Sequence, residues 1–115
     1  MFKTIGNHYG PFDLSLIAIG AYCPRSFMKA QHVDPIEAVQ MHKDLKSRFS
    51  LGIHWGTFIL TDEKEDEPPE MLRKELEDKK MEIDEFIVTR IGETRLVTEK
   101  TSHCKDGPLD QLLYK

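Results

Sequence analysis

Two histidines, His32 and His54, stand where side chains can do chemistry in a layered α/β protein. His54 follows the short apolar stretch 51–53, which is typical of a buried strand, and precedes the glycine turn at Gly56. His32 lies in a loop that follows another apolar stretch. Strands joined by a crossover end at the same edge of a sheet, so we expect both rings at one cleft. Neutral imidazoles there can hold a metal ion or move a proton.

The remaining histidines are less suited to chemistry. His42 falls beside the apolar stripe of an expected helix and is interpreted as structural, whereas His8 lies in a turn and His103 in a polar tail. A zinc site needs three or four His, Asp or Cys ligands, and a pair of metals needs more. The sequence has no HxHxDH segment. A self-contained site for two metals is therefore not predicted from spacing alone.

Composition restricts the class of protein. The 115 residues suit one small domain, with 39% hydrophobic and 31% charged residues. A net charge of −4 without a basic stripe argues against nucleic acid as a partner. We expect neither a signal peptide nor a transmembrane segment, because no apolar run is long enough. Cys23 and Cys104 form no CxxC pair and are interpreted as ordinary thiols in an intracellular chain, with a disulfide left open.

Apolar runs and capping residues predict the elements that position the two histidines. The apolar run 14–19 is typical of a strand buried on both faces of a parallel sheet. Asp34, Pro35 and Glu37 predict a helix start with a capping box. The expected order is a helix end (1–8), a strand (13–20), a loop (21–33), a helix (34–47), a strand (50–55), an acidic exposed loop (61–70), a helix (69–80), and strands 86–89 and 95–97 forming a hairpin.

This order amounts to half of a layered α/β domain. Parallel sheets are normally covered on both faces, and these few elements make a thin core. We expect residues 1–97 to be part of a larger domain, as if cut from a longer chain. Residues 98–115 are polar and aperiodic, and we expect a disordered tail there.

Three motifs give the sequence a family resemblance. They are GPFDL at 10–14, QHVDP at 31–35 and HWGTF at 54–58. Together they resemble the C-terminal part of the N-acylphosphatidylethanolamine-hydrolysing phospholipase D family, whose members are zinc hydrolases of the metallo-β-lactamase fold. The resemblance covers about residues 1–97 and implies the C-terminal half of an αββα sandwich.

The resemblance also implies roles for single residues. His54 matches the family's last zinc ligand. His32 matches an active-site histidine that contacts substrate and is needed for activity, and Gln31 would sit beside it. We expect Trp55 and Phe58 only to pack the neighbouring wall.

The implied activity belongs to a longer parent. With two zinc ions, such an enzyme hydrolyses N-acylphosphatidylethanolamine to N-acylethanolamine and phosphatidic acid. It would be a peripheral protein on an intracellular membrane, with a homodimer as an expected assembly. We expect the 115-residue chain alone to be inactive, because most metal ligands would lie upstream. Two alternatives stay open: a non-catalytic truncated or interaction module, and another phosphodiesterase or lactonase of the same fold.

Overall fold

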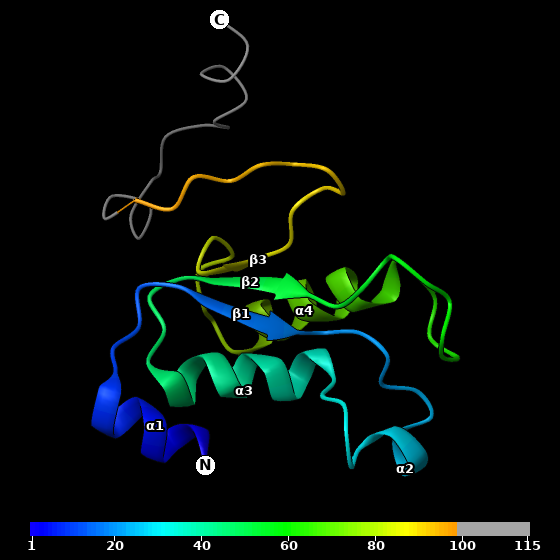
Figure 1. The fold of residues 1–115 in the computed structure, drawn as a ribbon, viewed down its shortest axis with the longest axis horizontal. Coiled ribbons are helices and arrows are strands. Elements are labelled where there is room, and N and C mark those ends of the chain that lie inside the picture. Colours follow the sequence, from blue (N-terminus) through cyan, green and yellow to red (C-terminus); the bar gives the residue numbers. More distant parts are fainter. Residues whose placement is uncertain (99–115) are drawn as a thin grey trace, which may run out of the picture.

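Three parallel strands in the order β1–β2–β3 form the sheet of the computed structural model, which describes residues 1–98 (Figure 1). Ser15 pairs with Ser50, and Ser50 pairs with Phe86, so the three strands start in register and run in the same direction. This arrangement confirms the expected α/β class and the crossover between the first two strands. The elements are α1 (Phe2–Tyr9), β1 (Ser15–Ala18), α2 (Arg25–Met28), α3 (Pro35–Leu45), β2 (Ser50–Ile53), α4 (Glu67–Asp78) and β3 (Phe86–Ile87).

Helix α3 begins as its sequence predicts. The Asp34 carboxylate accepts a hydrogen bond from the Glu37 amide at 2.8 Å, and the Glu37 carboxylate accepts one from the Asp34 amide at 3.2 Å. This capping box with Pro35 in the first turn satisfies amides that a helix start otherwise leaves unpaired. The helix ends at Leu45 because Lys46 adopts a left-handed conformation, with φ 56°. It is therefore slightly shorter than the expected 34–47.

The core lies between the sheet and helices α3 and α4, which pack on one side of it (Figure 1). Alternate strand residues point toward these helices because successive side chains of a strand face opposite ways. Burying each large apolar side chain stabilises the fold by about 1.5–3 kcal/mol. The buried cluster comprises Ile17, Ile19, Ala38, Val39, Leu72, Leu76 and Phe86.

The other face of the sheet is not buried as expected. Leu16 of β1 is 58% exposed and Ile53 of β2 is 42% exposed. The apolar run 14–19 therefore belongs to a strand covered on one face, and the prediction of burial on both faces is wrong for this chain. The physical reason is that α3 and α4 both pack on the opposite side.

His42 lies inside the helix-covered core, which confirms its structural role. Its ring is 3% exposed, and its Nδ1 lies 2.8 Å from the Ser50 hydroxyl. The ring also stacks on Phe86, with centroids 5.6 Å apart. Burial lowers the pKa of His42, since a charged imidazole would be poorly solvated there.

Several expected boundaries are corrected by the structure. The loop 21–33 contains the short helix α2, and α4 begins at Glu67 rather than near residue 69, with Pro68 and Pro69 in its first turn. Strand β2 stops at Ile53, before His54.

The expected hairpin at the end of the domain is wrong. Residues 95–97 are not a strand, and within residues 1–98 the two-residue strand β3 pairs only with β2, in parallel. Apart from Thr98, the tail predicted at 98–115 lies outside the described residues, and so do His103 and Cys104.

Candidate active site

The structure brings His32 and His54 together at the carboxyl edge of the sheet. Their ring centroids are 5.5 Å apart, with the planes tilted by 36°. His54 directly follows β2, and His32 lies between α2 and α3 in the connection that follows β1. In the described part of the chain, neither ring forms a hydrogen bond with another residue. Both imidazoles are therefore available to a ligand.

The backbone around His54 is held in an uncommon conformation. His54 has φ 62°, and Ala21, at the same edge, also has φ 62°. Left-handed backbone is unfavourable for residues that carry a Cβ, and such strain is concentrated at functional sites. A Cβ on Gly20 would collide with the carbonyl oxygen of His54. The connections after β1 and β2 thus touch through their backbones, which sets the positions of the two histidines.

Arg25 fixes the position of His32. Its guanidinium donates a hydrogen bond to the His32 carbonyl oxygen at 3.0 Å. It also pairs with Glu37 at 2.7 Å and with Asp34 at 3.4 Å, the two capping-box residues of α3. Helix α2 is therefore tied to the start of α3 across the segment that carries His32.

Glu63 fixes the other side of the same loop. Its carboxylate accepts hydrogen bonds from the amides of Tyr22 at 3.1 Å and Cys23 at 3.0 Å, and from the Thr61 hydroxyl at 2.7 Å. Burial acts against ionisation, but these hydrogen bonds outweigh it and hold the pKa of Glu63 below its usual value. Part of the expected exposed loop 61–70 is thus a clamp on the first residues after β1.

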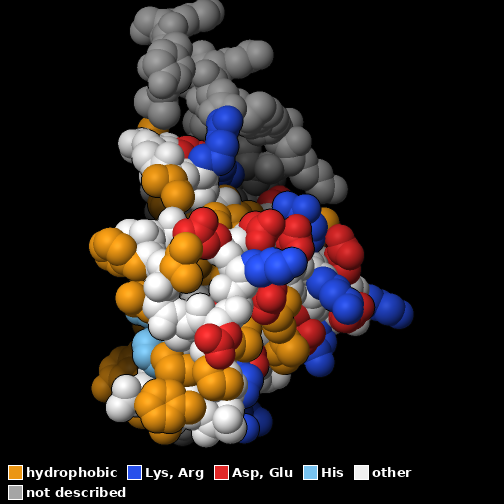
Figure 2. Space-filling model, turned by 90° about the vertical axis from the view of Figure 1, so that its right-hand side faces the viewer, with side chains coloured by type: hydrophobic (Ala, Val, Ile, Leu, Met, Phe, Trp, Pro, Cys, Tyr) orange, Lys and Arg blue, Asp and Glu red, His pale blue; other side chains and the backbone are white. Residues whose placement is uncertain are grey.

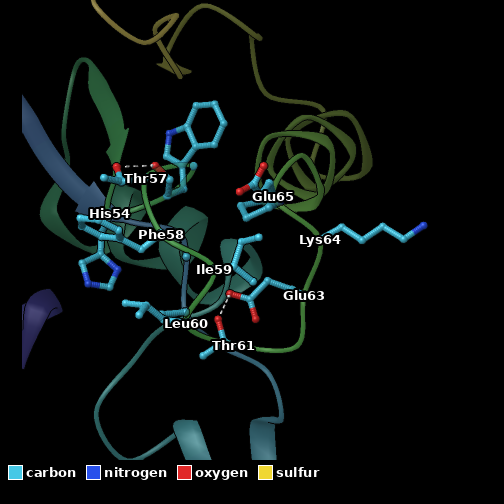
Figure 3. Close-up of a pocket in the computed structure, with 14 residues that line it drawn as sticks. His54, Thr57, Phe58, Ile59, Leu60, Thr61, Glu63, Lys64 and Glu65 are labelled. Carbon is cyan, nitrogen blue, oxygen red and sulfur yellow. Dashed lines mark hydrogen bonds between the residues drawn. The ribbon is translucent and has the colours of Figure 1, made fainter.

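A cavity of about 330 Å³ lies beside His54 (Figure 3). Trp55 lines it and packs partly buried against the core, as expected, and Phe58 lines it too but is 76% exposed. In Figure 3 the Lys64 side chain extends away from the other labelled side chains. The lining is Gly20, Ala21, residues 54–61, Glu63, Lys64, Glu65 and Pro68.

The residues of this edge do not complete a metal centre. Within residues 1–98 no group of three or more His, Cys, Asp or Glu side chains is placed to hold a metal ion. His32 and His54 are two imidazoles where zinc needs three or four ligands, and the nearby Asp34 carboxylate is engaged by Arg25 and the Glu37 amide. Imidazole nitrogens are ligands that zinc prefers, but two of them are too few to complete a zinc site.

Arg25 and Glu63 were missed by the sequence analysis. Arg25 lies 12 positions before its partner Glu37, and Glu63 lies 41 positions after Tyr22. Neither separation matches a local rule such as the i,i+3 spacing of a capping box. Only the folded arrangement identifies these two residues as supports of the site.

Comparison with known proteins gives this geometry a context. Residues 1–55 match the family described as the beta-lactamase superfamily domain. A Caenorhabditis elegans protein named N-acyl-phosphatidylethanolamine-hydrolyzing phospholipase D 1 is 48% identical over 95 residues, which are 80% of this chain and 26% of that protein. The mitochondrial enzyme of the same activity name from Saccharomyces cerevisiae is 46% identical over 73 residues, covering 63% of this chain and 16% of its own length.

The fold and these matches make the chain similar to part of a beta-lactamase superfamily domain. It is also similar to the nematode and yeast N-acyl-phosphatidylethanolamine-hydrolyzing phospholipases D, as the motifs predicted. The chain spans about a quarter of the nematode relative, 26% of its length. None of the helices in residues 1–98 is both long and apolar enough to cross a membrane.

Proposed function

We propose that residues 1–97 are the C-terminal part of a zinc-dependent phospholipase D. Its substrate would be N-acylphosphatidylethanolamine, and its products N-acylethanolamine and phosphatidic acid. The observation that carries this proposal is the pair of unpartnered rings, His32 and His54, at the carboxyl edge of the sheet. The names of the nematode and yeast relatives supply the substrate class.

His54 is the proposed metal ligand of this segment. Its ring is exposed, and its backbone follows directly from the rigid strand β2. Zinc, when bound, supplies an activated water and stabilises charge on phosphate oxygens. The remaining ligands of the two expected zinc ions would come from outside the described residues, because two imidazoles do not complete a site. By itself the 115-residue chain is therefore proposed to be inactive.

His32 is the proposed catalytic and substrate-binding residue. Its ring lies 5.5 Å from that of His54, close enough to face the phosphate of a substrate held there. From that position it would donate a hydrogen bond to the phosphate or a proton to the leaving group. Gln31, exposed beside it, would contribute a further polar contact to the lipid headgroup. Arg25 would keep His32 in place through its carbonyl oxygen.

The cellular setting is part of the same proposal. A phospholipid substrate lies in a bilayer, so the parent enzyme would act as a peripheral protein on an intracellular membrane. A homodimer is the proposed assembly.

A segment exchange tests the proposed function. Residues 1–97 would replace the matching segment of the nematode phospholipase D 1, to which 80% of this chain aligns. We expect the chimera to hydrolyse detergent-dispersed N-acylphosphatidylethanolamine and the 115-residue chain alone to show no turnover. A folded chimera that binds zinc but prefers a lactone or another phosphodiester would contradict the substrate assignment. Turnover by the purified chain alone would contradict the need for further ligands.

A further inference from the structure

The loop after β2 ends in three consecutive exposed apolar side chains. Phe58 is 76% exposed, Ile59 is 79% exposed and Leu60 is 72% exposed. All three line the cavity that also contains His54. In residues 1–98 the other strongly exposed large apolar residues do not form such a run of three. Water-exposed apolar clusters of this kind mark contact sites for lipids or proteins.

A further exposed apolar residue lies at the same edge of the sheet. Phe27, on the short helix α2 that follows β1, is 79% exposed. Figure 2 shows apolar side chains gathered around a histidine on the lower part of this side of the molecule, with most charged side chains further away. The edge that carries the candidate active site is therefore also an apolar surface.

We infer that the apolar loop 58–60 docks the protein on a zwitterionic lipid bilayer, so that the His32–His54 edge faces the lipid surface. This inference rests on the proposed function, because a lipid substrate explains why the apolar loop lines the cavity beside His54, whose ring neighbours that of His32. The three residues lie outside helices and strands and are largely exposed, which suits insertion among acyl chains at the bilayer interface.

The charges beside the loop decide which lipid surface fits. The exposed residues that follow it are acidic apart from one lysine, whose side chain points away from the labelled pocket residues (Figure 3). An anionic surface would repel this segment, whereas phosphatidylcholine, with no net charge, would not. The exposed charged residues are Asp62, Lys64, Glu65 and Asp66.

Vesicle binding by the 115-residue chain tests the docking surface. The chain has one tryptophan, Trp55, which lines the same cavity and gives a built-in optical probe. We expect phosphatidylcholine vesicles to shift its emission to the blue, and brominated phosphatidylcholine to quench it. Replacing Phe58, Ile59 and Leu60 together by serine should weaken vesicle binding about tenfold, since less apolar area enters the bilayer.

The matched control removes three apolar residues from the bare face of the sheet. Leu14, Leu16 and Ile53, each partly exposed, are replaced by serine, and far-UV circular dichroism confirms folding of both triple variants. We expect this control to bind vesicles as the unchanged chain does. If the sheet-face variant loses binding and the loop variant keeps it, the docking surface is wrongly assigned.

Three other outcomes would also overturn the inference. They are binding that needs phosphatidylserine and fades with salt, absence of Trp55 quenching by brominated phosphatidylcholine, and a dimer in sedimentation that only the loop variant loses. The assay contains no N-acylphosphatidylethanolamine and needs no zinc. A failed docking test therefore leaves the hydrolase proposal standing, and a failed chimera leaves the docking result standing.

Discussion

The helix-covered core and the carboxyl edge of the sheet use the same side chain in opposite ways. In the core, His42 is buried, bonded to Ser50 and stacked on Phe86. At the edge, the His32 and His54 rings face each other without hydrogen-bond partners in the described residues. A histidine with satisfied bonds stabilises a fold, whereas a supported but unpartnered one is positioned to bind something else.

The backbone shows the same contrast. Most residues of the core lie in helices or strands, whereas Ala21 and His54 at the edge adopt left-handed conformations, both with φ 62°. Each such residue costs about 1–3 kcal/mol and persists because its surroundings hold it. Here the surroundings include Glu63, which clamps the segment after Ala21, and Gly20, which contacts the His54 backbone. The backbone conformation at this edge is thus locally unfavourable and is maintained by tertiary contacts.

The largest expected effect is at His54. In the chimera with the nematode enzyme, His54→Ala should lower kcat by about 10³-fold or more and remove zinc together with activity. Elemental analysis and turnover on dispersed substrate measure the two effects. His8→Ala, an exposed helix residue, is the matched control and should change neither. Full zinc content in the His54 variant would refute the ligand role.

His32 should separate catalysis from metal binding. In the same chimera, His32→Ala should keep its zinc and lose about 10²-fold in kcat, because a group that hydrogen-bonds or protonates the substrate is removed. Zinc loss comparable to that of the His54 variant would make His32 a ligand instead.

His42 should affect stability rather than chemistry. Burial lowers its pKa from 6.5, so the folded chain keeps it neutral where the unfolded chain takes up a proton. Its contribution is therefore present above pH 6.5 and is lost as the pH falls below that value. Glu85, 3.7 Å from its Nε2, is the acidic group that faces it and reduces this loss when the ring is protonated.

Replacement of His42 measures that contribution. At pH 8, His42→Leu should lower the free energy of unfolding by about 1–3 kcal/mol, because the buried Ser50 hydroxyl loses its partner. The variant should also show a flatter loss of stability below pH 6.5 in urea titrations. An unchanged pH dependence would show that another group dominates this range.

The smallest expected effect tests the strained edge. Ala21→Gly should raise the free energy of unfolding by about 0.5–1 kcal/mol, because glycine adopts the left-handed backbone without a Cβ penalty. Ala18→Gly, in strand β1, is the control and should lower it. Thermal unfolding of both variants provides the measurement. A loss of stability in the Ala21 variant would mean that its methyl group contributes packing.

Local sequence rules predicted much of the fold and part of the candidate site at the carboxyl edge of the sheet. The capping box at Asp34, the crossover and the structural role of His42 follow from short-range pattern and burial logic, and the structure confirms them. The expected closeness of His32 and His54 followed from parallel strands ending at one edge. Their chemical roles stay predictions.

The failures have physical reasons. An apolar run such as 14–19 shows that a strand is apolar on both sides, but not whether both sides are covered within the same chain. The expected hairpin at 95–97 depended on local propensity, which tertiary context overrides. Supports such as Arg25 and Glu63 depend on partners far along the chain, which spacing rules do not detect.

Zinc bound per chain in the purified 115-residue protein tests the central claim most directly. His54 is proposed to contribute to a metal centre that the described residues do not complete. Elemental analysis after dialysis should therefore give close to zero zinc per chain, while the chimera that carries residues 1–97 in the nematode enzyme holds zinc. One or two zinc ions retained by the chain alone would contradict the account, because a complete site would then be built from its own residues.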